Sequence, residues 1–158
     1  GSVIPLFYDQ IKDNKPITIT DPKMTRFMMS LDNAVELVLY AFQNGNTGDI
    51  FVQKAPSTTI GELAETMKTI YNSNTKIKNI GIRHGEKIHE TLLSQEERIV
   101  SEDLGDYFRI PADNRDLNYD KYFSKGVKAP KSEEFNSFNT VRLEKQELIN
   151  LLSSIGYK

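Results

Sequence analysis

A short charged turn holds the residues that are best suited to chemistry. Arg83, His84 and Glu86 stand around Gly85, directly after the apolar stretch 77–82, which the residue pattern predicts to be a strand. A strand that ends in a glycine-containing turn is a common way to present an arginine to an anion, because a guanidinium matches phosphate oxygens with two parallel hydrogen bonds. We therefore treat this turn as a candidate anion-binding site.

A second arginine, Arg26, lies in a largely apolar stretch. A guanidinium there needs a partner, because an unpaired buried charge is costly. The partner could be a ligand phosphate, or a structural carboxylate such as Asp21 or Asp32. Glu86 is equally open, since it could bind a ribose diol beside a phosphate or form a weak surface ion pair with Arg83. The spacing alone does not choose between these alternatives.

The remaining titratable groups give little indication of catalysis or metal binding. His84 and His89 lack a carboxylate at a spacing that would orient them, which predicts solvated histidines in a turn and on a helix surface. The chain has no cysteine and only two histidines, so neither a disulfide nor a His- or Cys-based metal site is expected. No glycine-rich turn of the dinucleotide or P-loop kind occurs, and no nucleophile elbow. We therefore assign no catalytic residue to this chain.

Length and charge narrow the class of protein. At 158 residues with a net charge of −2, the chain predicts one ordinary domain with no basic surface for nucleic acid and no charge block for a membrane. No apolar run reaches the ~18 residues that a membrane span needs. These features fit a cytoplasmic location. Gly1 and Ser2 could be an expression scar, and an apolar run starts at once at Val3, so we expect a piece of a longer protein.

Periodicity predicts the elements that would position the two arginines. Thr59 and Glu62 have the spacing of a capping box. Helix 31–43 is apolar on more than one side, so we expect it and strand 49–53 to be buried. Residues 87–93 could open a helix, and Met24, Met28 and Met29 are expected to fill the core. The predicted helices are 2–13, 31–43, 59–71 and 144–155, and the predicted extended segments are 17–20, 25–29, 49–53, 77–82 and 107–111.

Several longer motifs resemble one family of enzymes. They are Met24–Phe27, Gly48–Pro56, Arg83–Lys87, Tyr107–Pro111 and Arg115–Tyr119. Together they resemble the C-terminal, substrate-binding part of polysaccharide-biosynthesis extended short-chain dehydrogenase/reductases, enzymes of capsule and surface glycan synthesis that act on UDP-N-acetylglucosamine. The resemblance implies a mixed α/β fold without the N-terminal Rossmann half, which in such enzymes binds NADP or NAD and carries the catalytic residues.

The resemblance also implies a function and a site. The intact enzyme would be an inverting UDP-N-acetylglucosamine 4,6-dehydratase. The alternatives are a UDP-sugar 4-epimerase and a non-catalytic module that binds nucleotide sugars or a partner. Arg26 and Arg83 would bind the diphosphate and Glu86 the uridine ribose.

For this chain alone, the resemblance implies no bound cofactor and no activity. Its partners would be a UDP-sugar, the missing Rossmann half and further copies in a homo-oligomer. We expect a nucleotide-sugar-binding core over 1–93, a long loop or lid over 94–130, and a linker with a C-terminal helix over 131–158.

Overall fold

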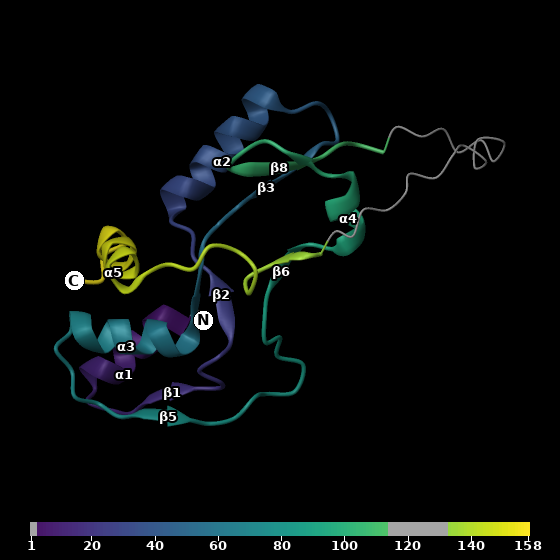
Figure 1. Ribbon diagram of the computed structural model, residues 1–158. Coiled ribbons are helices and arrows are strands. Elements are labelled where there is room, and N and C mark those ends of the chain that lie inside the picture. The colour runs from purple at the N-terminus through teal and green to yellow at the C-terminus, as the bar shows by residue number, and fades with distance from the viewer. Residues whose placement is uncertain (1–2, 114–132) are drawn as a thin grey trace. The chain divides into compact units, whose positions relative to one another are not determined.

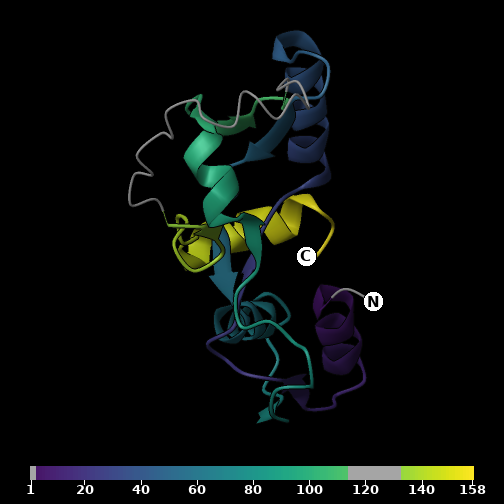
Figure 2. The same ribbon diagram turned by 90° about the vertical axis from the view of Figure 1, so that its right-hand side faces the viewer.

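The described residues, 3–113 and 133–158 of the computed structural model, form two compact units that are each built from separate stretches of chain (Figures 1 and 2). Unit 1 takes residues 3–30, 55–90 and 137–158, and unit 2 takes 31–54, 91–113 and 133–136. The predicted mixed α/β fold is confirmed.

Unit 1 combines helices with two pairs of short strands. In the first pair β1 and β5 run parallel, with Ile17 opposite Ile77. In the second, β2 and β4 run antiparallel, with Arg26 opposite Thr58. The elements are α1 (Val3–Lys12), β1 (Ile17–Ile19), β2 (Thr25–Phe27), β4 (Ser57–Thr59), α3 (Ile60–Ile70), β5 (Ile77–Asn79) and α5 (Lys145–Ser154).

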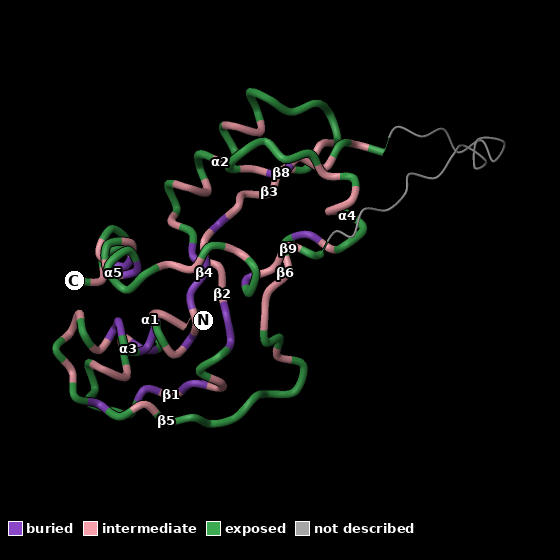
Figure 3. Tube along the Cα trace, in the orientation of Figure 1, coloured by how far each residue is buried: buried purple, intermediate pink, exposed green. Residues whose placement is uncertain are grey.

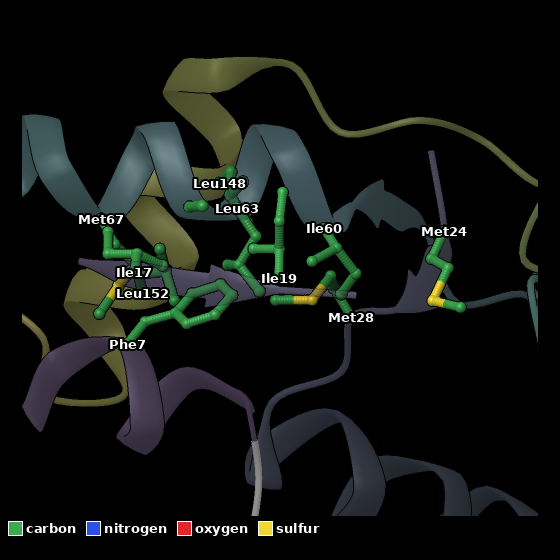
Figure 4. Packing of buried hydrophobic residues seen from close by; sticks show 11 residues of the cluster. Phe7, Ile17, Ile19, Met24, Met28, Ile60, Leu63, Met67, Leu148 and Leu152 are labelled. Carbon is green, nitrogen blue, oxygen red and sulfur yellow. The ribbon is translucent and has the colours of Figure 1, made fainter. Parts of the chain in front are cut away.

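The core of unit 1 lies where its helices meet β1. Figure 4 shows Phe7 of α1 close to side chains of β1, α3 and α5. Phe7, Ile17 and Leu63 are fully buried. Helix α3 begins with the predicted capping box, because Thr59 Oγ1 accepts from the Glu62 backbone and the Glu62 carboxylate accepts from the Thr59 backbone. Other buried members of this core are Ile19, Met24, Met28, Ile60, Ala64, Met67, Leu148 and Leu152.

Unit 2 contains a three-stranded antiparallel sheet in the order β3-β8-β7 and a two-stranded antiparallel sheet of β6 and β9. Its rings pack in small groups, with Tyr40 of α2 stacked on Tyr107 of β8 at 4.2 Å between centroids. Its elements are α2 (Leu31–Asn44), β3 (Ile50–Gln53), β6 (Thr91–Leu93), α4 (Gln95–Val100), β7 (Glu102–Asp103), β8 (Tyr107–Ile110) and β9 (Phe135–Asn136).

Helix α2 forms where predicted, but the expectation that it is buried is wrong for the described chain. It contains no buried residue, and Figure 3 draws it without a buried segment. Leu31 is 77% exposed and Phe42 is 84% exposed. In β3, Ile50 is 55% exposed. Most of the apolar side chains that suggested a covered helix are therefore exposed, among them Val35, Val38 and Leu39, whereas Ala34, Leu37 and Ala41 are half-buried.

Local predictions failed in the region after the charged turn. Residues 87–93 do not open a helix; the last three form β6 instead. Helix α4 was missed, although Ser94 and Glu97 form a capping box at its start. Met29 is 39% exposed and is not core, whereas Met24 and Met28 are buried as predicted. Part of the predicted lid, residues 114–130, lies outside the described residues.

Candidate functional site

The charged turn after β5 is a tight turn that needs its glycine. The Glu86 backbone N–H donates to the Arg83 carbonyl oxygen at 3.1 Å, which closes four residues into one turn. Gly85, the third residue of the turn, has a φ of 78°, a left-handed value that type II turns have at this position and that glycine adopts without strain. The turn therefore holds Arg83 and Glu86 in a fixed backbone relation.

Arg26 is anchored to the segment that follows this turn. Its Nη2 donates to the carbonyl oxygen of Lys87 at 3.0 Å, and its Nη1 donates to those of Thr25 at 2.7 Å and Ile88 at 3.3 Å. Its side chain is 23% exposed. The structural partners proposed from sequence, Asp21 and Asp32, form no ion pair with it. Two carboxylates lie near it instead, with Glu90 Oε1 at 3.5 Å from Nε and Glu86 Oε1 at 3.9 Å from Nη2.

The side chain of Glu86 has hydrogen-bond partners within the protein, whereas the guanidinium of Arg83 does not in the described residues. Glu86 Oε1 accepts from Thr20 Oγ1 at 3.2 Å, and Oε2 accepts from the Arg83 backbone N–H at 3.3 Å. The side-chain ion pair between Arg83 and Glu86 that the spacing allowed does not occur. Within the part of the chain that the structure describes, the guanidinium of Arg83 has no hydrogen bond or ion pair. It is therefore available to a ligand.

A buried group of polar side chains holds the segment after the turn against β2. Thr25 Oγ1 lies 2.8 Å from His89 Nδ1 and 2.6 Å from Ser137 Oγ, and Ser137 Oγ also accepts from the Glu90 backbone at 2.9 Å. The His89 ring packs on Phe138 at 4.9 Å. His89 is thus half-buried and bonded, and the prediction of a solvated helix-surface histidine is wrong. Sequence could not reveal this group, because Thr25 and Ser137 are 112 positions apart.

Unit 1 contains a cavity of about 580 Å³. Arg26, Arg83 and Glu86 line it together with Thr18 and Thr20, so the three residues singled out from the sequence meet at one place. The remaining wall is mostly apolar and comes from α1, the ends of β1 and β2, and α3. Cavities of this size with few polar groups on an apolar wall are typical of small-molecule sites.

The chemistry that this cavity can perform is binding of an anion with hydroxyl groups. Guanidinium groups donate to phosphate oxygens, and a carboxylate accepts from hydroxyls. Among the described residues, no group of three or more His, Asp or Glu side chains is placed to hold a metal ion. No helix in the same residues has the length and apolar character needed to cross a membrane.

Comparison with known proteins identifies the family. A family model for polysaccharide biosynthesis proteins matches residues 1–112, and a model for the C-terminal part of polysaccharide biosynthesis proteins matches residues 113–157. The chain belongs to this family. The Rickettsia members of this family that it matches carry the name of an enzyme.

Two curated relatives are called UDP-glucose 4-epimerase. The one from Rickettsia bellii (strain OSU 85-389) is 56% identical and the one from Rickettsia rickettsii (strain Sheila Smith) is 55% identical, each over 99% of this chain. The X-ray structure of Pen from Bacillus thuringiensis superposes with a TM-score of 0.80 at 35% identity, over all of this chain and 46% of Pen. The chain also spans 46% of the length of each Rickettsia relative, so it corresponds to part of a longer family member. The predicted resemblance to polysaccharide-biosynthesis enzymes is confirmed.

Proposed function

We propose that the cavity of unit 1 binds the UDP portion of a nucleotide sugar. The observation that carries this proposal is the guanidinium of Arg83, which has no partner in the described residues and borders the same cavity as Arg26 and Glu86. A diphosphate carries about two negative charges and is well matched by two convergent guanidinium groups. The named activity of the Rickettsia relatives, on UDP-glucose, supports the nucleotide.

Each residue has a separate role in this proposal. Arg83 binds a phosphate directly. The Nη1 and Nη2 groups of Arg26 donate to the carbonyl oxygens of Thr25, Lys87 and Ile88. Its Nε lies 3.5 Å from Glu90 Oε1, so Arg26 fixes the turn and contributes its positive charge to the cavity. The Glu86 carboxylate has acceptor capacity beyond its bonds to Thr20 and Arg83, and would accept from the ribose hydroxyls.

The reaction of the longer enzyme has two candidates, both starting with hydride removal at C4 of the sugar. The motif resemblance favours an inverting UDP-N-acetylglucosamine 4,6-dehydratase, in which water is then lost across C5 and C6. The names of the Rickettsia relatives favour 4-epimerisation. In either reaction this chain would hold UDP so that the sugar meets the reacting groups, which is a positioning role.

Among the described residues, the junction of β4 and α3 does not fit the pyrophosphate of a dinucleotide cofactor. Where β4 passes into α3, a pyrophosphate would need free helix N–H groups. Instead the Glu62 carboxylate accepts from the Thr59 N–H at 3.2 Å, and the Glu62 N–H donates to Thr59 Oγ1 at 3.0 Å. We therefore derive no cofactor step from this chain, and propose that NADP or NAD belongs to the other part of the longer enzyme.

Calorimetric titration of the chain with UDP and with uridine tests the site. We expect UDP to bind, and Arg83→Ala to weaken UDP at least about tenfold, the loss of one charge-assisted bond, while leaving uridine unchanged. Glu86→Gln should weaken both ligands. Lys145→Ala removes an exposed positive charge of unit 1 outside the cavity and serves as the control. Absence of UDP binding, or equal UDP affinity in Arg83→Ala and the parent, would contradict the proposal.

A second experiment separates the candidate functions. The chain is mixed with the separately expressed remaining part of the Rickettsia bellii relative, and products from UDP-N-acetylglucosamine and UDP-glucose are read by NMR. A 4-keto-6-deoxy product indicates the dehydratase and inversion at C4 alone indicates the epimerase. UDP binding without turnover in an assembled pair would favour the third alternative, a non-catalytic nucleotide-sugar-binding module.

A further inference from the structure

Thr20, which the sequence analysis did not single out, lies beside the charged turn because two strands run parallel. Strands β1 and β5 pair in parallel, and just beyond the pair the Ile80 N–H donates to the Ile19 carbonyl oxygen at 2.8 Å. The chain therefore leaves both strands at the same edge, at Thr20 after β1 and toward the turn with Glu86 after β5. Ligands of α/β proteins commonly bind beyond the carboxyl ends of parallel strands.

The Thr20 hydroxyl has two acceptors within reach and only one proton. Glu86 Oε1 and Met24 Sδ each lie 3.2 Å from Thr20 Oγ1. A thioether sulfur is a weak acceptor, whereas a hydroxyl that donates to a carboxylate forms a charge-assisted hydrogen bond, which is stronger than a bond between neutral groups. The proton of Thr20 therefore goes to Glu86, which lies 66 positions away along the chain.

This bond and two further groups fix the Glu86 carboxylate at the cavity. Oε2 accepts from the Arg83 N–H at 3.3 Å, and Oε1 lies 3.9 Å from Arg26 Nη2. Each carboxylate oxygen has two acceptor positions, so each keeps one after these hydrogen bonds. The Glu86 side chain is 27% exposed and lines the cavity. Two fixed acceptors side by side suit two neighbouring hydroxyl groups, which is the arrangement of the 2′ and 3′ hydroxyls of ribose.

We propose that Thr20 is a positioning residue that holds the Glu86 carboxylate toward the ribose diol and thereby makes the cavity selective for ribonucleotides over 2′-deoxyribonucleotides. This inference rests on the proposed binding of UDP in the same cavity. A glutamate side chain that is free to rotate must be ordered when a ligand binds, which costs affinity. Thr20 orders it beforehand. A 2′-deoxyribose has one hydroxyl of the pair, so it leaves one carboxylate oxygen without its donor.

Calorimetric titration of the full chain with UDP and with 2′-deoxy-UDP tests this role. We expect the parent to bind UDP at least about tenfold more tightly, as for one hydrogen bond to a charged group. Thr20→Val, of nearly the same shape without the hydroxyl, should reduce this ratio to less than about threefold, and Thr20→Ala should do the same. Thr20→Ser, which keeps the hydroxyl, should retain the parent ratio. Thr69→Val removes an exposed hydroxyl bonded to the Glu65 carbonyl oxygen and is the matched control.

Two further variants separate positioning from a structural role and from a failure of the UDP site. In the Glu86→Ala background, adding Thr20→Val should lower UDP affinity no further, because Thr20 acts through Glu86. Arg83→Ala should weaken both nucleotides by the same factor and keep their ratio, because both carry the diphosphate.

The outcomes that overturn the inference differ from those that overturn UDP binding. If Arg83→Ala weakens UDP, but Thr20→Val keeps the parent ratio or the parent binds both nucleotides equally, Thr20 does not position Glu86 and the proposed function stands. If Thr20→Val weakens both nucleotides by the same factor, the role of Thr20 is structural. Absence of UDP binding by the parent contradicts both the inference and the proposed function.

Discussion

Arg26 and Lys87 are joined by a hydrogen bond of 3.0 Å from Nη2 to the carbonyl oxygen. The bond ties strand β2 to the residue that follows Glu86, so the same guanidinium that borders the cavity also holds the turn that carries Arg83. Arg83 makes no such contact in the described residues. Arg26 therefore contributes to the folded structure as well as to the candidate site, whereas Arg83 does not. Substitutions of the two arginines should have different effects on stability.

The two arginines should differ in their effect on stability. Arg26→Ala removes the donor to the Lys87 carbonyl oxygen and one of the two donors to the Thr25 carbonyl oxygen, and should lower the free energy of unfolding by about 1–3 kcal/mol. Arg83→Ala removes an exposed side chain and should change it by less than about 0.5 kcal/mol. Urea unfolding followed by circular dichroism measures both. Equal losses of stability would contradict the separate roles.

Ser137 should be a stability residue of unit 1. Its hydroxyl contacts Thr25 Oγ1 and accepts from the Glu90 N–H, so Ser137→Ala leaves the Glu90 N–H without this acceptor and removes one of the two side-chain contacts of Thr25 Oγ1. We expect a loss of about 1–3 kcal/mol in the free energy of unfolding. Ser154→Ala, which removes an exposed hydroxyl bonded to the Leu151 carbonyl oxygen, is the matched control and should cost little. If the two variants unfold at the same urea concentration, the hydrogen bonds of Ser137 do not hold the segment around Glu90 against β2.

The exposed apolar residues of α2 should tolerate replacement by a charged residue without loss of stability. Phe42→Lys should change the free energy of unfolding by less than about 0.5 kcal/mol, because Phe42 is 84% exposed. Phe7→Ala, at a fully buried site, should cost about 3–5 kcal/mol. Phe42→Lys should also raise the solubility of the chain, since it interrupts an apolar patch. A large loss of stability in Phe42→Lys would mean that α2 is covered.

Asp49 should make the stability of unit 2 depend on acidity. Backbone N–H groups of Asn46 and Ala112 donate to its carboxylate, and these bonds hold the pKa of Asp49 below the ordinary value of 3.8. A lowered pKa contributes stability that is present above pH 3.8 and is lost as the pH falls through the folded-state pKa.

Replacing Asp49 by asparagine tests whether this carboxylate stabilises the fold at neutral pH. Asp49→Asn should lower the urea midpoint at pH 7 and lose this deficit progressively below pH 3.8, because the parent carboxylate is then protonated. Asp9→Asn, which also removes one exposed carboxylate, is the control for the change in net charge. A deficit of Asp49→Asn that persists unchanged at pH 2 would contradict an electrostatic origin.

Much of the local structure followed from the sequence because its causes are local. The Thr59 and Glu62 capping box, the helix at 31–44 and the glycine turn at 85 depend on contacts within a few residues. Such patterns cannot say what a helix packs against. The apolar residues of α2 predicted burial, and in the described chain most of them are exposed.

The sequence by itself determined the residue types that can bind an anion and the family to which the chain belongs. Only the tertiary structure decided how they are used. It brought Arg26, Arg83 and Glu86 to one cavity, left Arg83 without a partner among the described residues, and placed Thr20 beside Glu86. The reason is physical: whether a guanidinium is satisfied depends on carbonyl and carboxylate oxygens that lie tens of positions away, such as Lys87 for Arg26. Spacing along the chain does not encode those distances.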